Sequence, residues 1–297
     1  MNNRMQARLV LFVALIVATL TSCEKAVFDG DEQSSTGQQD ANVVLRLSVF
    51  DMETFGETSS TRAYSDISEL ATRLNLVVLK NGEKVKTVSQ KQGDSSFGTV
   101  ALSLAEGTYQ VVAIAHNCDG TATITSADKI TFPNNIVTDT FYYYDDLTVG
   151  STAVSQNLTM RRAVAMFRLI LTDDLPASVR KLKFYYTGGS STFSALSGYG
   201  CVNSRQTVNI TVSDGQKVFE VYTFPHDEQG ELKMTITALD AQDNAVGERV
   251  FESVPVARNY ITRYTGSLLG GGTNAPESSG IRFSVDGDWS GENADVF

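Results

Sequence analysis

Few side chains in this sequence are suited to covalent or metal chemistry. The 297 residues include only two histidines, His116 and His226, and three cysteines. Neither histidine has neighbours with the spacing of a zinc motif, and no nucleophile elbow or comparable catalytic motif occurs. We therefore interpret both histidines as loop or strand-end residues. The sequence predicts a protein that is not an enzyme and that binds no metal or other cofactor.

One acidic segment imitates the start of a calcium loop. Asp286-Gly287-Asp288-Trp289-Ser290-Gly291 places oxygen donors at alternate positions and a glycine at the sixth. The twelfth position of such a loop supplies a bidentate glutamate, but here it is Phe297. We therefore interpret the segment as a turn after the last strand.

The overall composition excludes one class of partner. The net charge is −10 and the pI is near 4.7, whereas binding to a nucleic-acid backbone requires a basic face. Nucleic acid is therefore not expected as a partner. With 42% hydrophobic and 20% charged residues, the chain is typical of globular proteins, and its length allows one large domain or two smaller ones.

The amino terminus has the pattern of a lipoprotein signal peptide. Arg4 and Arg8 precede an uncharged apolar run of 12 residues, 9–20, which is too short to span a bilayer. The run ends in Leu20-Thr21-Ser22-Cys23, which resembles a bacterial lipobox. We expect residues 1–22 to be removed and Cys23 to carry lipid that anchors the chain in the outer membrane, since two or more acyl chains hold a protein stably. The alternative is an ordinary secreted protein.

A flexible tether is expected between the lipid and the folded part. Residues 23–41 are rich in acidic residues, glutamine, serine and glycine and lack apolar periodicity. Acidic residues directly after the lipidated cysteine also resemble the surface-export signals of Bacteroidetes lipoproteins. Exposure on the cell surface is therefore predicted.

Alternation of apolar and polar residues predicts a nearly all-β protein from residue 42 onward. In the first strand, Val43, Leu45, Leu47 and Val49 share one face. Asn81-Gly82 predicts a hairpin, and residues 65–72 a short helix. Further strands are expected at residues 74–79, 100–104, 109–115, 164–171, 181–186, 207–212, 217–224, 232–238, 249–254 and 281–285.

The rhythm of short strands favours two β-sandwich domains in tandem, at residues 42–150 and 151–297. We place their joint at residues 147–151. A single large sandwich is the competing interpretation. Cys118 and Cys201 fall in different predicted domains; an oxidising envelope would permit a disulfide between them, but we favour two separate thiols.

Several segments, taken in order, resemble the fimbrillin superfamily of Bacteroidetes, and within it most closely the FimB- and Mfa-like fimbrial subunits. These segments are Cys23-Glu24-Lys25, Thr61-Arg62-Ala63, the run Leu158-Thr159-Met160-Arg161-Arg162-Ala163-Val164-Ala165, residues 256–266 and Asp288-Trp289. The resemblance implies two transthyretin-like β-sandwich domains, export by the lipoprotein pathway and assembly with other fimbrial subunits into surface fimbriae. It also implies adhesion to a host or bacterial receptor.

The resemblance further implies assembly by strand exchange. In the family, shaft subunits are cleaved at an arginine after their first strand, and a neighbouring subunit fills the groove that the strand leaves. Arg62 and Ala63 match this cleavage position, and Val43, Leu45, Leu47 and Val49 would form the apolar face of the exchanged strand. Anchor subunits of the family are not cleaved, so cleavage here stays open. A donor strand is the segment that one subunit inserts into the groove of its neighbour. The carboxyl end is mostly polar and shows no long strand of this kind, and residues 260–269 are an alternative donor.

Two aromatic clusters leave a second function open. Residues 141–144 (Phe-Tyr-Tyr-Tyr) and 184–186 (Phe-Tyr-Tyr) could stack on sugar rings, although alternation along a strand sends every other ring into the core. Core packing is our main interpretation. The alternative function is a glycan-binding surface lipoprotein of a nutrient-uptake system, in which Tyr142 or Tyr185 would contact the sugar.

Overall fold

The computed structural model describes residues 41–51 and 67–269, and within them nearly all regular structure is β. The expected all-β fold is confirmed. Helical structure in this part is limited to α2 (Ile67–Leu70), within the predicted helix 65–72, and a 3-10 turn at Pro133–Asn135.

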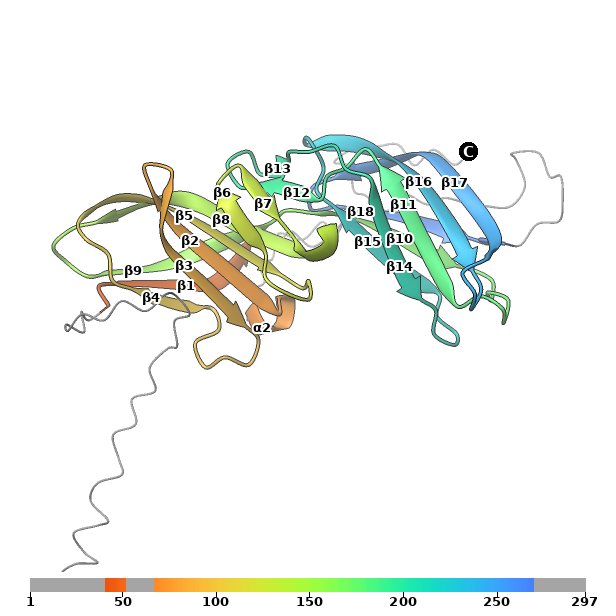
Figure 1. The fold of residues 1–297 in the computed structure, drawn as a ribbon, viewed down its shortest axis with the longest axis horizontal. Coiled ribbons are helices and arrows are strands. Elements are labelled where there is room, and N and C mark those ends of the chain that lie inside the picture. The colour runs from red at the N-terminus through yellow and green to blue at the C-terminus, as the bar shows by residue number, and fades with distance from the viewer. Residues whose placement is uncertain (1–40, 52–66, 270–297) are drawn as a thin grey trace, which may run out of the picture. The chain divides into compact units, whose positions relative to one another are not determined.

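Seven strands form sheet A, which holds the first strand of the chain (Figure 1). In spatial order they are β3 (Glu83–Lys91), β2 (Arg73–Lys80), β5 (Gly107–His116), β8 (Thr140–Val149), β9 (Val154–Arg162), β1 (Val43–Asp51) and β4 (Thr99–Leu102). All neighbouring pairs are antiparallel except β1 and β9, which run parallel. The predicted hairpin joins β2 to β3, and Asn81 and Gly82 both have positive φ, as a type I′ turn requires.

Sheets C and D enclose a second core. Sheet C contains β15 (Val218–Thr223), β10 (Ala165–Leu171) and β18 (Ile261–Gly266) in that order. Sheet D contains β14 (Gln206–Thr211), β11 (Lys181–Thr187), β16 (Gln229–Leu239) and β17 (Ala245–Ala257). Their inward side chains are buried, and Phe167, Phe184 and Phe219 are at most 1% exposed. The segment 260–269, considered above as a donor, contains β18, which pairs parallel with β10 of its own chain.

A fourth sheet joins strands from both parts of the sequence. Sheet B contains β13 (Tyr199–Gly200), β12 (Thr192–Ser194), β7 (Lys129–Thr131) and β6 (Thr123–Ser126), with β7 paired to β12. A third core lies here and includes Ile130, Phe193 and Phe224. Strand β2 contributes to two cores, because Leu76 faces the first core and Val77 the third.

The division into two transthyretin-like domains stays a prediction. Strand β9 belongs to sheet A, and its Leu158 and Met160 lie in the first core, although the predicted boundary assigned residues 151–162 to the second domain. Residues 147–151, the predicted joint, contain the end of β8 and the start of the turn into β9. Within the described ranges, no helix is both long enough and apolar enough to cross a membrane.

Candidate functional site

The first strand buries the apolar face that sequence reasoning selected. Val43, Leu45 and Leu47 are each 0% exposed and belong to the first core. Strand β1 lies between β9 on one side and β4 on the other (Figure 1). Its residues 43–46 pair with both neighbours, whereas residues 49–51 pair with β9. The inner face of the strand therefore packs on an apolar core, and its backbone pairs with the neighbouring strands on both sides.

Polar contacts fix the start and the register of this strand. The side chain of Asn42 makes two hydrogen bonds to the backbone of Leu104. Its Nδ2 donates to the Leu104 carbonyl at 2.7 Å, and its Oδ1 accepts from the Leu104 N–H at 2.9 Å. On the exposed face, Arg46 Nη1 donates to Ser155 Oγ of β9 at 2.7 Å. The register with β9 shifts after Arg46, where the Leu47 N–H bonds to the carbonyl of Gly98 at 2.8 Å.

Other predicted site residues lie outside the described structure. Cys23, Arg62 and Ala63 fall in residues 1–40 and 52–66, as does the predicted tether apart from Ala41. The backbone of Val49 pairs with Thr159 of β9, but its side chain is not among those described. The predicted strand 281–285 and the acidic turn 286–291 also lie outside. The lipidation and cleavage sites therefore stay predictions.

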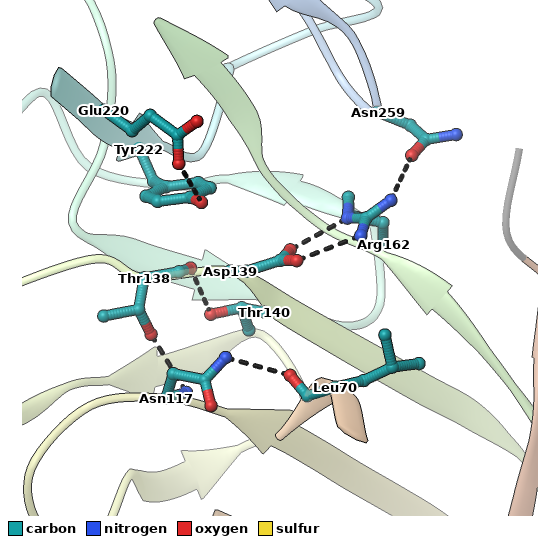
Figure 2. A network of polar contacts seen from close by, with 9 residues as sticks. All are labelled: Leu70, Asn117, Thr138, Asp139, Thr140, Arg162, Glu220, Tyr222 and Asn259. Carbon is teal, nitrogen blue, oxygen red and sulfur yellow. Dashed lines mark hydrogen bonds and ion pairs between the residues drawn. The ribbon is translucent and has the colours of Figure 1, made fainter. Parts of the chain in front are cut away.

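A largely buried ion pair brings together two of the segments that carried the family resemblance (Figure 2). Arg162, the last residue of β9, binds Asp139 through two hydrogen bonds, Nε to Oδ1 at 2.8 Å and Nη2 to Oδ2 at 2.9 Å. Its Nη1 donates to Asn259 Oδ1 at 3.2 Å, and its guanidinium lies 4.6 Å from the centroid of the Phe141 ring. Arg162 belongs to the segment 158–165 and Asn259 to the segment 256–266, so these two segments meet at one place.

The surrounding polar groups of this network are also paired (Figure 2). Thr140 Oγ1 donates to the carbonyl of Thr138 at 2.8 Å, and Asn117 Nδ2 donates to the carbonyl of Leu70 at 2.9 Å. Burial raises the pKa of the Tyr222 phenol, and the Asp139 carboxylate raises it further. These contacts link β8, β9 and the loop before β18 at one place.

Another arginine, Arg258 of the segment 256–266, holds the turn between β12 and β13. Arg258 Nη1 donates to Tyr142 Oη and to the carbonyl of Gly198, both at 3.2 Å, and its guanidinium stacks 4.8 Å from the centre of the Tyr199 ring. Gly198 has φ +79°, and a Cβ at this position would come within 2.5 Å of Tyr142 Oη. Glycine is therefore required for the close approach.

The roles of Arg162, Asp139 and Arg258 were not predicted from the sequence. Both arginines stood in segments that resemble the family, which is the signal that could have identified them. Asp139 lies in no such segment, and only the folded chain brings it to Arg162, 23 positions away.

The cluster 184–186 follows the predicted alternation, but the cluster 141–144 does not, because Phe141 packs in the first core and the adjacent Tyr142 in the third. Phe141 and Tyr142 are 0% and 6% exposed, and the Tyr142 ring packs against Phe193 with centroids 4.9 Å apart. Phe184 and Tyr186 are both 0% exposed, whereas Tyr185 is 37% exposed on the outer face of sheet D. Core packing is thus confirmed for four of these rings. Tyr142 is buried and is unsuited to contact a sugar.

The cysteines and histidines of the described structure do not gather into one site. Cys118 is buried and Cys201 is exposed, and both are free thiols. His226 lies after β15 and bonds to the carbonyl of Gly200. Residues 41–51 and 67–269 contain no group of three or more histidine, cysteine or acidic side chains placed to hold a metal ion.

His116 ends β5, as expected for a strand-end residue, and is completely buried. Its Nδ1 accepts from the Cys118 N–H at 3.0 Å, so Nε2 carries the proton and donates to Asn75 Oδ1 at 3.0 Å. Burial, with a smaller contribution from the Arg73 charge, lowers the pKa of His116 from 6.5 to about 4. The folded protein therefore holds this imidazole neutral in mild acid.

This shift predicts a loss of stability in acid. As pH falls from 6.5 to about 4, the unfolded chain binds a proton that folded His116 does not, so the free energy of unfolding falls. The total loss from this group should be about 3 kcal/mol. Urea unfolding of wild type and His116→Gln across this range measures the effect. The glutamine variant should lose less stability between neutral pH and pH 4; an equal loss in both proteins would contradict the assignment.

The described chain is thus an all-β protein whose predicted site is a first strand with one completely buried face. A family model matches residues 35–296, and the chain belongs to this family, described as a family of unknown function (DUF6562). No curated protein matches the sequence.

Several solved bacterial structures are similar to this chain. A proposed polysaccharide-binding protein from Bacteroides thetaiotaomicron has a TM-score of 0.50 at 11% identity, covering 82% of this chain and 95% of that one. A proposed adhesin from Bacteroides ovatus has a TM-score of 0.49 at 13% identity, with 82% and 94% covered. The fimbrial anchor protein Mfa2 from Porphyromonas gingivalis has a TM-score of 0.43 at 11% identity, with 81% and 94% covered. At 11% identity, the likeness to the first of these structures concerns the fold alone.

Proposed function

We propose that this protein is a surface-exposed lipoprotein subunit of fimbriae, of the anchor or accessory type, that assembles with other subunits by strand exchange and supports cell adhesion. The observation that carries the proposal is the complete burial of Val43, Leu45 and Leu47 on the inner face of the first strand, which lies between β9 and β4. The lipobox at Cys23 and the ordered resemblance to fimbrial subunits support it from the sequence.

The geometry of β1 suits an exchangeable strand. If the strand leaves, β9 and β4 both present unpaired backbone groups, which are a template for a strand of another chain. The side chains of Val43, Leu45 and Leu47 would leave an apolar groove. Burial of three such side chains stabilises by roughly 5 to 9 kcal/mol before entropy is subtracted. A replacement strand with the same alternation would therefore be held firmly.

Two modes of assembly follow from whether the chain is cut at Arg62-Ala63. An uncut chain keeps β1 in place and acts as an anchor or accessory subunit, lipid-bound to the outer membrane through Cys23. A cut chain can release β1 and accept a strand from a neighbour. Mass spectrometry of the protein from native cells distinguishes them, because the mature chain begins at Cys23 in the first case and at Ala63 in the second.

Strand exchange can be tested by competition. We expect purified protein to form heat-sensitive polymers, and a synthetic peptide of residues 42–51 to suppress them. The same peptide with Leu45→Asp should be inactive, because it places a carboxylate on the apolar floor. In cells, deletion of residues 42–50 should remove the protein from fimbriae seen by immunogold electron microscopy. Absence of polymers, together with normal fimbrial labelling of the deletion variant, would refute the proposal.

Glycan binding is a second candidate, favoured by one exposed ring. Tyr185 lies on the outer face of sheet D between Thr207 of β14 and Thr235 of β16, with Val250 of β17 beyond, and this row has no charged side chain. A flat face with an exposed aromatic ring suits stacking on a sugar. Titration with oligosaccharides should show binding that Tyr185→Ala abolishes and Tyr144→Ala, a change at a half-buried tyrosine elsewhere, preserves. Equal binding by both variants would exclude this face.

A further inference from the structure

The outermost strands of sheets A and D differ in how they resist pairing with another chain. Exposed strand edges are usually protected by charges, proline, register breaks or short length. Strand β4 has only four residues. Strand β3 carries three lysines, Lys84, Lys86 and Lys91. Strand β17 carries Glu248, Arg249, Glu252 and Pro255, and its pairing has two register breaks.

Strand β14 has none of these protections. It is the outermost strand of sheet D in the described structure, next to β11 (Figure 1), and consists of Gln206-Thr207-Val208-Asn209-Ile210-Thr211. It contains no charge and no proline, and its six residues pair with β11 without a register break. Thr207, Asn209 and Thr211 are exposed, while Val208 and Ile210 pack against the second core. The strand is thus flat, uncharged and rich in β-branched residues, which favours pairing with another strand.

The sequence of β14 is nearly symmetric about Asn209. Val208 and Ile210 flank this residue on its two sides, and Thr207 and Thr211 come next. We propose that β14 pairs antiparallel with β14 of a second copy of this chain, around a two-fold axis at Asn209. Such a contact is self-complementary, and it joins two copies of sheet D into one continuous sheet. Val208 would lie opposite Ile210 of the second copy, and Thr207 opposite Thr211.

Charges at the ends of the strand favour this register. Arg205 precedes β14 and Asp214 follows it, and both are exposed. With the axis at Asn209, Arg205 lies opposite Ser213 of the second copy, next in sequence to its Asp214. The two-fold axis generates this attraction at both ends, and no like charges face each other directly along the strand. A parallel pairing would instead bring the two Arg205 residues together.

This contact is distinct from strand exchange at β1, because it uses a different sheet. A seam of six residues buries less surface than a typical stable interface of about 1,200 to 2,000 Å². We therefore expect a weak dimer in solution that becomes populated at the high local concentration of an anchored or assembled protein.

Charge exchange at Asn209 tests the axis directly. Sedimentation analysis of the full chain over a concentration series should show a reversible dimer for wild type. Asn209→Lys and Asn209→Asp each place two like charges on the axis and should each weaken dimerisation at least tenfold. An equimolar mixture of the two variants should restore it, since lysine then faces aspartate. Thr87→Lys, the same charge added to β3, is the control and should leave dimerisation unchanged.

Three results would overturn the proposal. The first is a wild-type protein that stays monomeric at all concentrations. The second is an Asn209→Lys variant that dimerises as wild type does. The third is a mixture of the two variants that associates no better than either alone. Lys183 lies beside Asn209 on β11, so thermal unfolding of each variant checks that the fold is retained. Because β1 is untouched, loss of this dimer leaves strand exchange unaffected, and the two proposals fail separately.

Discussion

Replacing Leu45 with alanine is expected to lower the free energy of unfolding by about 2 to 5 kcal/mol. Leu45 is 0% exposed in the middle of the first core, between β9 and β4, so the truncated side chain leaves a cavity that the two flanking strands can close only partly. The neighbouring residue is a matched control. Arg46 lies on the exposed face of the same strand and bonds to Ser155, and Arg46→Ala should cost less than about 1 kcal/mol.

Urea unfolding followed by circular dichroism measures both variants. The contrast between adjacent positions isolates burial from strand propensity, because both substitutions introduce alanine into the same strand. If Leu45→Ala and Arg46→Ala cost the same, the first strand does not pack as described, and the groove on which strand exchange depends would be too weak to hold a replacement strand.

Replacing Arg162 with methionine is expected to cost about 3 to 5 kcal/mol. The change leaves the Asp139 carboxylate, which is 19% exposed in its side chain, without its bidentate partner, and it removes the bond to Asn259. The penalty comes mainly from the stranded charge. The double variant Arg162→Met with Asp139→Leu should therefore be more stable than Arg162→Met alone.

A second arginine pair provides the comparison. Arg168 and Glu220 form an ion pair of 2.7 Å between β10 and β15, with side chains 26% and 33% exposed. Water can solvate the glutamate that Arg168→Met leaves behind, so this variant should cost about 1 kcal/mol or less. Equal losses for Arg162→Met and Arg168→Met in urea unfolding would show that burial of the Arg162 pair does not matter to stability.

Much of the strand content was predictable because its signal is local. Alternation within a strand depends only on neighbouring residues, and it placed Val43, Leu45 and Leu47 on one face, which the structure confirms. The turn at Asn81-Gly82 was equally predictable, because both residues tolerate positive φ. Short strands such as β12 and β13 were missed, since two or three residues carry no measurable alternation.

The sheet to which β9 belongs could not be predicted from local sequence patterns. Its sequence alternates as a strand should, but nothing in the alternation specifies which sheet it joins. The structure pairs Val154 with Val43 and Arg46 with Asn157, positions more than one hundred residues apart in the chain. Parallel pairing of this kind needs a long connection, and its register depends on every strand that lies between.

The sequence alone therefore determined that this chain is all-β, that its first strand has one apolar face, and that several segments, among them 158–165 and 256–266, resemble fimbrial subunits. Only the tertiary structure decided that β1 lies between β9 and β4, and that the arginine and asparagine of those two segments meet beside Asp139. The reason is physical. A residue's preference for a strand is set by its neighbours in sequence, whereas strand partners and ion pairs are set by the closure of long loops, for which distant residues carry no local signal.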